Sequence, residues 1–364
     1  MPNTAKKSES DVLSGRKAEK PVTIKSIAKE LGVSFSTVSK ALNDDPCIKE
    51  ETRKMVHAKA KEMGYTPNSL ARSLRSNESL TIAVILNDIE NPVLTHIFKR
   101  ISDEMAKFGY TTIIMDSYFD LDTEKKNINV ILAQQPDFVI WEPASTGLEN
   151  LNLFSAMTNR LILLGPRFPV SGIHQVSVDY EAGGYEAAMN MLSCGHRDNL
   201  VLTLPLTVPN SSSYVDGIRC AYREFGLELD DERILTSPDS TVVGGSAQIT
   251  RLWDMEGRKF QVPFTGVMTF DDNVACGVLK AVRQFGLRVP EDVSISGFDD
   301  NPLIAYFDPS LSTVHLPQEE IAESCLNIIK ARLIDNDTEI QGYYINPHLV
   351  KRKSVINLLS SSSS

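Results

Sequence analysis

Residues 23–43 read TIKSIAKELGVSFSTVSKALN, and this stretch decides the fold of the N-terminal part of the chain. Thr23 is a favourable helix N-cap, and after it apolar side chains recur at helical spacing as Ile24, Ile27, Ala28 and Leu31. Gly32 then allows the left-handed backbone conformation of a sharp turn. Ser34 can cap a second helix over residues 35–42, with Val38 facing inward. The pattern therefore predicts two short helices joined by a tight turn.

A third helix is predicted over residues 50–63, where Met55, Val56 and Met63 are expected to face inward and Gly64 ends the helix. Two helices around a glycine turn, followed by a third that completes a small core, describe a helix-turn-helix unit. A three-helix cap with no role in DNA binding is the alternative at this point.

The N-terminal region is basic, whereas the rest of the chain is acidic. Residues 1–79 contain 15 Lys and Arg and 10 Asp and Glu, which gives a net charge of +5. The remaining residues contain 22 basic and 37 acidic side chains, which gives a net charge of −15. A polyanion such as nucleic acid would therefore meet only the N-terminal region, although a charge of this size can also arise by chance.

From residue 81 onward, apolar strand segments alternate with amphipathic helices. Strands are predicted over residues 81–86, 111–115, 138–141, 160–164, 175–178, 199–204, 266–269 and 294–297. Helices are predicted over residues 93–108, 181–194, 214–225, 272–285 and 318–334. This alternation is typical of doubly wound parallel sheets, and about 270 residues is too many for one such sheet. We expect two doubly wound parallel-sheet subdomains, with a ligand at the strands' carboxyl ends or between the two lobes.

Several classes of protein are excluded by what the sequence lacks. It contains no P-loop, GxSxG elbow or HExxH motif, and no GxGxxG follows a predicted strand. Six isolated histidines and five scattered cysteines indicate neither a metal cluster nor a disulfide framework. We therefore expect no catalytic residue, no metal site, no cofactor and no enzymatic activity. The polar N-terminus and the short apolar runs predict neither a secretory signal nor a membrane span, hence a cytoplasmic protein.

Several motifs resemble those of the lactose-repressor (LacI/GalR) family over residues 22–353. The most specific is the string at residues 23–43, and it is followed by ETR at 51–53, GYTPN at 64–68 and ARSL at 71–74. Motifs similar to the family's effector domain are VDY at 178–180, GHR at 195–197, VPEDVS at 289–294 and GFDD at 297–300. The resemblance implies a homodimeric transcription factor. It would have an all-α helix-turn-helix domain with a hinge helix, followed by an α/β core like that of the periplasmic binding proteins.

The resemblance also implies which residues of the helix-turn-helix domain meet double-stranded operator DNA. The residues that would read base edges in the major groove are Phe35, Ser36 and Lys40. Lys40 can donate to guanine, at a position where the family commonly has Arg. The residues that would contact phosphates are Thr23, Ser34, Thr37 and Asn43. Phe35 has an alternative role, which is packing on the first helix.

Residues 68–75 match the family's hinge helix, which forms on operator DNA. Within it, Asn68, Ala71 and Leu74 would contact the DNA, with Leu74 as a wedge in the minor groove and Ala71 small enough to allow close approach. A free helix of about eight residues is too short to be stable alone, which makes the segment a natural switch. A plain linker is the alternative.

An effector bound between the lobes would change their relative angle and hence the separation of the two hinges. The residues that the resemblance assigns to this site are Asp88, Asn91, Leu94, Asn210, Asp271 and Asp299, and Arg167 could supply a cation. Tyr214 stands where the family usually has Arg, which argues against an anionic effector and favours a neutral sugar. The alternative for Asn91, Asp271 and Asp299 is that they serve only as helix N-caps. The alternative for Arg167 is a surface salt bridge.

The predicted organisation combines these parts. It comprises a disordered N-terminal arm (residues 1–21), a helix-turn-helix domain (22–67), a hinge and linker (68–79), a two-lobed effector-binding and dimerisation core crossed three times by the chain (80–353) and a tail (354–364). Without C-terminal leucine heptads, a dimer that reads a pseudo-palindromic operator is expected.

The implied function is that of a DNA-binding transcriptional regulator, by family habit a repressor, controlled by a small carbohydrate. Two alternatives stay open. The first is the same regulator with a non-sugar effector or a protein co-regulator. The second is a sugar-binding protein without a role on DNA.

Overall fold

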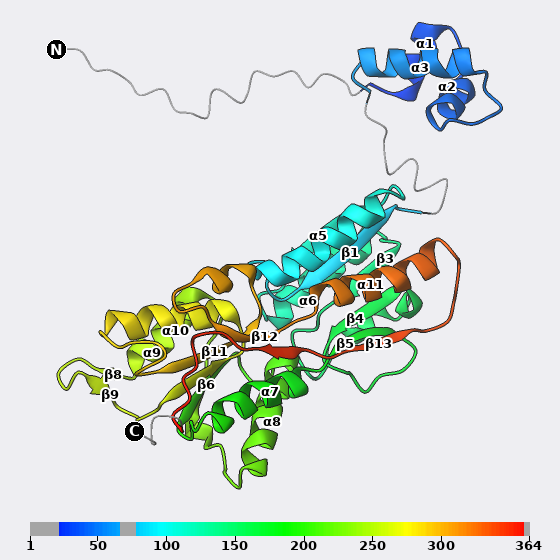
Figure 1. Ribbon diagram of the computed structural model, residues 1–364. Helices are drawn as coiled ribbons and strands as arrows, with labels where there is room; N and C mark the ends of the chain where they lie inside the picture. Colours follow the sequence, from blue (N-terminus) through cyan, green and yellow to red (C-terminus); the bar gives the residue numbers. More distant parts are fainter. Residues whose placement is uncertain (1–21, 66–77, 360–364) are drawn as a thin grey trace, which may run out of the picture. The chain divides into compact units, whose positions relative to one another are not determined.

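The computed structural model describes residues 22–65 and 78–359 of the chain (Figure 1). The chain divides into two compact units, residues 1–76 and residues 77–364. The first unit is α-helical in its described part and the second is a parallel α/β structure, which confirms the predicted fold class. Within the described ranges, no helix is long and apolar enough to cross a membrane.

The first unit contains α1 (Ile24–Leu31), α2 (Phe35–Leu42) and α3 (Glu50–Glu62). Thr23 and Ser26 form a reciprocal capping box at the start of α1, and Gly32 ends that helix in the left-handed conformation, with a φ of 65°. The buried core is formed by Ile27, Ala28, Val38, Ala41, Val56 and Ala60. The inward orientation expected for Met55 is wrong. Its side chain is exposed because Val56 and Ala60 form the inner face of α3.

A six-stranded parallel sheet forms the first lobe of the second unit (Figure 1). Its strands are β1 (Thr81–Leu86), β2 (Thr111–Asp116), β3 (Phe138–Trp141), β4 (Leu161–Gly165), β5 (His174–Val178) and β13 (Gly342–Ile345). They lie in the order β13–β5–β4–β3–β1–β2, and all neighbours are parallel.

The second lobe contains another six-stranded sheet, in the order β14–β12–β11–β10–β6–β7. Its strands are β6 (Asn199–Thr203), β7 (Ile234–Thr236), β10 (Gly266–Thr269), β11 (Ser294–Asp299), β12 (Ser312–His315) and β14 (His348–Val350). Only β14 runs antiparallel to its neighbour within this described sheet. A small hairpin of β8 (Trp253–Asp254) and β9 (Lys259–Phe260) lies apart from both sheets.

Helices cover the sheets on both faces, as the side chains of β1 show, because successive residues pack on opposite faces of the sheet. Ile82, Val84 and Leu86 belong to one apolar cluster with side chains of α5 and α11, whereas Ala83 and Ile85 belong to another with side chains of α6. The helices of this unit are α5 (Pro92–Ala106), α6 (Leu121–Ala133), α7 (Tyr180–Ser193), α8 (Pro209–Glu224), α9 (Val242–Arg251), α10 (Asp272–Gln284) and α11 (Gln318–Leu333).

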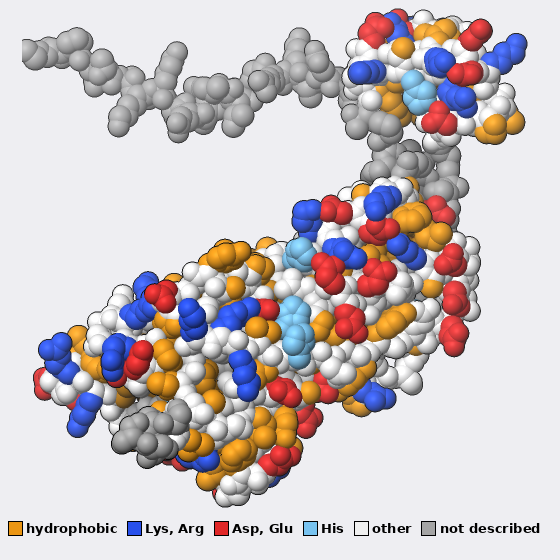
Figure 2. Space-filling model, viewed as in Figure 1, with side chains coloured by type: hydrophobic (Ala, Val, Ile, Leu, Met, Phe, Trp, Pro, Cys, Tyr) orange, Lys and Arg blue, Asp and Glu red, His pale blue; other side chains and the backbone are white. Residues whose placement is uncertain are grey.

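The chain passes between the two sheets after β5, after β12 and after β13. The passage after β12 leads to α11, which lies beside α5 (Figure 1). Figure 2 shows side chains of both charges alternating over these two helices. Among them, Arg100 pairs with Glu319, and Lys330 of α11 pairs with Glu104 of α5. These exposed pairs contribute little to stability, so the apolar residues beneath hold the two helices together.

The segment after residue 353, assigned to a tail from the sequence, packs against the second lobe. Ser354 is fully buried, and its hydroxyl donates to the carbonyl of Ile295, 2.5 Å away, while accepting from the backbone N–H of Ser312. The backbone N–H of Ile356 donates to the hydroxyl of Ser294, 3.0 Å away. The described part of this segment, up to residue 359, is therefore part of the core.

Candidate functional site

The outer face of α2 carries exposed side chains at and near its N-terminus. Phe35 is 50% exposed although it is large and apolar, and Ser36 and Lys40 are also exposed. Phe35 is not part of the core of the first unit, so packing on α1 does not account for it. Among the residues that the structure describes, Lys40 makes only a long ion pair, with 3.9 Å between its Nζ and Oδ2 of Asp45. An exposed aromatic ring and a cation on one helix suit a thymine methyl group and a guanine edge.

The polar residues predicted to contact phosphates also form hydrogen bonds at the ends of α1 and α2. Ser34 accepts a hydrogen bond from the backbone N–H of Thr37, 3.0 Å away, and thereby caps α2. Thr23 caps α1 in the same way. Asn43 follows α2 and donates from its Nδ2 to the carbonyl of Ser39, at 2.8 Å. Capped helix N-termini favour anions, because their free N–H groups carry partial positive charge.

Three of the predicted DNA contacts fall in the hinge. Asn68, Ala71 and Leu74 lie outside the described residues, so the structure places none of them.

The second candidate site is a closed cavity between the two lobes of the second unit. Its volume is only about 30 Å³. Its lining residues are Asp88, Asn91, Leu94, Phe119, Glu142, Tyr180, Asn210, Ser240, Phe270, Asp271, Asp299 and Leu316. Many of them follow or end a parallel strand, which is where ligands of such sheets bind. The structure thus brings together six of the seven residues that the sequence assigned to an effector.

Asn91 joins the two lobes across this cavity. Its Oδ1 accepts from the backbone N–H of Val93, 2.9 Å away, and so caps α5. Its Nδ2 donates to Oδ2 of Asp271 at 3.0 Å and to Oδ2 of Asp299 at 2.7 Å. Asp271 in turn caps α10. Asn91 and Asp271 therefore cap helices and line the cavity at once, whereas Asp299 ends β11 and caps no described helix.

Further hydrogen bonds connect the lobes. The buried carboxylate of Glu142 accepts from Nδ2 of Asn210 in the second lobe, 3.0 Å away, and also from the backbone N–H of Asn87 in its own lobe, 3.2 Å away. The hydroxyl of Ser240 donates to Asp88. Because these contacts join residues of both sheets, the two lobes close directly on each other.

Burial dominates the electrostatics of the cavity. It raises the pKa of Glu142 to about 7 and that of Asp271 to about 7. Burial also raises the pKa of Asp299, and the charges of Asp271 and Asp272 raise it further. Burial raises the pKa of Asp88 as well. The described lining contains no Lys, Arg or His to oppose these shifts.

Arg167 is the one predicted effector residue that the structure places elsewhere. It is exposed and lines a separate groove with residues 170–177 and 340–344. Tyr214, which replaces the family's Arg, is fully buried and donates its hydroxyl to the carbonyl of Thr269, 3.1 Å away. Neither residue brings positive charge to the cavity.

Six lining residues were missed from the sequence: Phe119, Glu142, Tyr180, Ser240, Phe270 and Leu316. Glu142 could have been found, because it follows the predicted strand 138–141 at the edge where ligands bind. Ser240 lies in the loop before α9, around the position where the resemblance places an aromatic residue that stacks on the ligand.

The chain is similar to known proteins in both of its units. Residues 23–68 match the bacterial regulatory proteins of the lacI family, and residues 188–355 match the periplasmic binding protein-like domain. The chain is 28% identical over 340 residues to the HTH-type transcriptional repressor PurR of Aliivibrio fischeri, covering 93% of this chain and 99% of that protein. It is 29% identical over 337 residues to the HTH-type transcriptional regulator RegA of Clostridium saccharobutylicum, covering 92% and 99%.

Solved structures share the fold over nearly the whole chain. The lac repressor dimer bound to operator and the anti-inducer ONPF has a TM-score of 0.76 at 22% identity, with 93% of this chain and 100% of that chain covered. The complex of the transcriptional regulator CelR with cellobiose has a TM-score of 0.65 at 22% identity, with 92% and 99% covered.

A helix-turn-helix unit whose second helix exposes its outer face, together with a two-lobed domain around a polar cavity, defines a DNA-binding transcriptional regulator. The chain belongs to the LacI family of bacterial regulatory proteins.

Proposed function

We propose that the protein is a repressor that binds a pseudo-palindromic operator as a homodimer, and that a small carbohydrate in the cavity between its lobes controls operator affinity. The observation that carries this proposal is the exposed face of α2, where Phe35 and Lys40 project from a helix whose opposite face is buried. In this proposal Phe35, Ser36 and Lys40 read bases. Thr23, Ser34, Thr37 and Asn43 hold the phosphates.

The cavity supports the proposal for the effector. In its closed form it has room for only a water molecule or two, so a ligand of sugar size must separate the lobes or enter while they are apart. Three sets of hydrogen bonds, made by Asn91, Glu142 and Ser240, would then be exchanged for contacts with the ligand. The closed and ligand-bound arrangements form the two states that an allosteric effector needs.

Operator binding with and without sugars tests this function. Fluorescence anisotropy with a palindromic operator from upstream of the protein's own or neighbouring genes, at fixed physiological salt, should give specific binding that one sugar shifts several-fold. Binding that no sugar changes would contradict the carbohydrate effector and favour another ligand or a protein co-regulator. Absence of any sequence-specific DNA binding would contradict the regulator itself.

Leu74→Ala tests the hinge that the proposal requires. We expect operator affinity to fall about tenfold or more, because the minor-groove wedge that unstacks the central step is lost. The anisotropy assay measures it, with Leu121→Ala in the second unit as the control. Undiminished operator affinity would remove Leu74 from the proposed interface.

A further inference from the structure

The cavity between the lobes contains several carboxyl groups and, in its described lining, no cationic side chain to neutralise them. Its four carboxyl side chains are those of Asp88, Glu142, Asp271 and Asp299. Asp116 and Asp272 lie close enough to raise the pKa of Glu142 and Asp299, respectively. No cationic side chain lies in the described lining. An unpaired buried carboxylate is costly, so such a cavity favours either protons or a cationic ligand.

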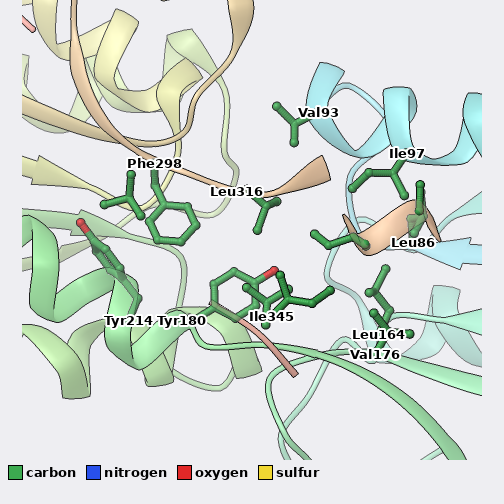
Figure 3. Packing of buried hydrophobic residues seen from close by; sticks show 14 of the residues in the cluster. Leu86, Val93, Ile97, Leu164, Val176, Tyr180, Tyr214, Phe298, Leu316 and Ile345 are labelled. Carbon is green, nitrogen blue, oxygen red and sulfur yellow. The ribbon is translucent and has the colours of Figure 1, made fainter. Parts of the chain in front are cut away.

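A second, independent feature of the cavity is the hydroxyl group of Tyr180. This side chain is 7% exposed and lines the cavity. Among the described residues its hydroxyl has no hydrogen-bond partner, whereas buried tyrosine hydroxyls usually find one. Figure 3 shows the ring of Tyr180 with its hydroxyl pointing away from Tyr214. The cavity thus offers a hydroxyl group, without a partner among the described residues, that a ligand can satisfy.

We propose that the effector is a small polyhydroxylated molecule that carries a protonated amine, of the amino-sugar type, and that its ammonium group binds between Asp271 and Asp299. This inference rests on the proposed function, and it replaces the neutral sugar expected from the sequence by a cationic one.

The groups around the cavity suit such a molecule. An ammonium group offers three N–H donors, and Asp271 and Asp299 already present their Oδ2 atoms to a single donor, Nδ2 of Asn91. The side chains of Tyr180 and Phe270 add apolar surface to the lining, on which the carbon skeleton of a sugar can pack. The remaining carboxylates accept hydrogen bonds from sugar hydroxyls. A ligand with a phosphate or carboxylate would instead meet like charges, so the same groups exclude it.

Binding of an ammonium group should release a proton. Buried carboxyls in mutual contact cannot all be ionised near neutral pH, so the pair of Asp271 and Asp299 keeps a proton when no cation is present. The titratable groups that act on this pair and on Glu142 are all acidic: Asp88, Asp116, Asp272 and Tyr180, with Asp300 beside Asp272. A bound ammonium group favours the ionised form and displaces about one proton, whereas a neutral sugar has no such effect.

The experiment compares matched sugars on the full-length protein. Glucosamine, galactosamine and mannosamine are titrated by calorimetry at pH 7, beside their N-acetyl forms and their neutral parent sugars. Two buffers with different enthalpies of ionisation are used, so that proton release appears as a difference in heat. We expect one amino sugar to bind with release of about one proton. Its N-acetyl form and its neutral parent should bind about tenfold more weakly or worse.

Variants assign the effect to the carboxyl pair. Asp299→Asn keeps an acceptor for Asn91 but removes the charge, so amino-sugar affinity should fall about tenfold or more and proton release should shrink. Tyr180→Phe removes only the hydroxyl group and should weaken the same ligand several-fold, which provides a second variant. Asp122→Asn makes the same chemical change at an exposed position of α6 and should change neither readout.

The outcomes separate this inference from the proposed function when operator anisotropy is measured on the same sugars. If a neutral sugar binds and shifts operator affinity while no amino sugar does, the cationic effector is overturned and the proposed function stands. Equal affinity for an amino sugar and its N-acetyl form also overturns it. If no sugar of either kind binds, the carbohydrate effector fails and this inference fails with it.

Discussion

Gly217→Ala is expected to lower the free energy of unfolding of the second unit by about 3 kcal/mol, because it forces two closely packed helices apart. A Cβ at Gly217 of α8 would lie 1.8 Å from the carbonyl oxygen of Glu181 in α7, and one at Gly184 of α7 would lie 2.0 Å from that of Tyr214. Both obstacles are backbone atoms, so no side-chain rotation relieves them. Thermal unfolding should show a loss of roughly 5 °C or more.

The direction of the change in stability distinguishes close helix packing from the usual effect of a Gly→Ala substitution. Alanine in place of glycine normally stabilises a helix by about 0.5–1 kcal/mol, because it restricts the unfolded chain. Glu186→Ala, on the exposed side of α7, is the control and should leave the melting temperature nearly unchanged. A melting temperature of Gly217→Ala at or above that of the unaltered protein would show that the two helices can separate without loss.

The free energy of unfolding should be lower at pH 8 than at pH 6.5 by about 2 kcal/mol or more, because buried carboxyls of the cavity must ionise in this range. The folded-state pKa of Glu142 is raised from 4.5 to about 7, and that of Asp271 from 3.8 to about 7. Between these limits the folded protein binds more protons than the unfolded chain, so stability falls as pH rises. This is the reverse of a salt-bridged carboxyl such as Asp292, whose pKa is lowered to about 2 by Arg288.

Urea unfolding at several pH values measures the effect. The chosen window avoids His174 and His196, because burial lowers their pKa and they therefore reduce stability only as pH falls below about 6.5. Asp299→Asn should raise stability at pH 8 and reduce the difference between the two pH values. A stability that is constant or increases from pH 6.5 to pH 8 would contradict the buried, uncompensated carboxyls.

The alternation of apolar segments predicted most of the second unit, and the failures have local causes. The eight predicted strands correspond to β1–β6, β10 and β11 within a residue or two. The strands β7, β8, β9, β12, β13 and β14 were missed, since each has four residues or fewer and the edge strands β7, β13 and β14 are mostly only partly buried. The helices α6 and α9 were not predicted, and in α9 the pattern is interrupted by Gly244 and Gly245, both buried. Short strands of this kind are stabilised by packing and hydrogen bonds with neighbouring strands of the sheet, which the sequence of the segment itself does not show.

Only half of the residues that line the candidate cavity could be predicted from the sequence. Six of its residues follow from the resemblance, but their environment does not. Asn91 meets Asp271 and Asp299 across 180 and 208 residues of sequence, and Glu142 meets Asn210 across 68. The raised pKa values of these carboxyls depend on burial among one another, a quantity that no single segment contains.

The helix-turn-helix unit follows from local sequence alone, because Thr23, Gly32 and Ser34 cap or end helices within a few residues of themselves. The parallel α/β class also follows from local patterns, since apolar runs such as β1, buried along almost its whole length, alternate with amphipathic helices. Tertiary structure brings four carboxyls into one cavity whose described lining has no cationic side chain, and it places Arg167 elsewhere. Caps, turns and apolar periods are set over a few residues, whereas the charge and shape of a ligand site depend on which distant loops the two sheets bring together.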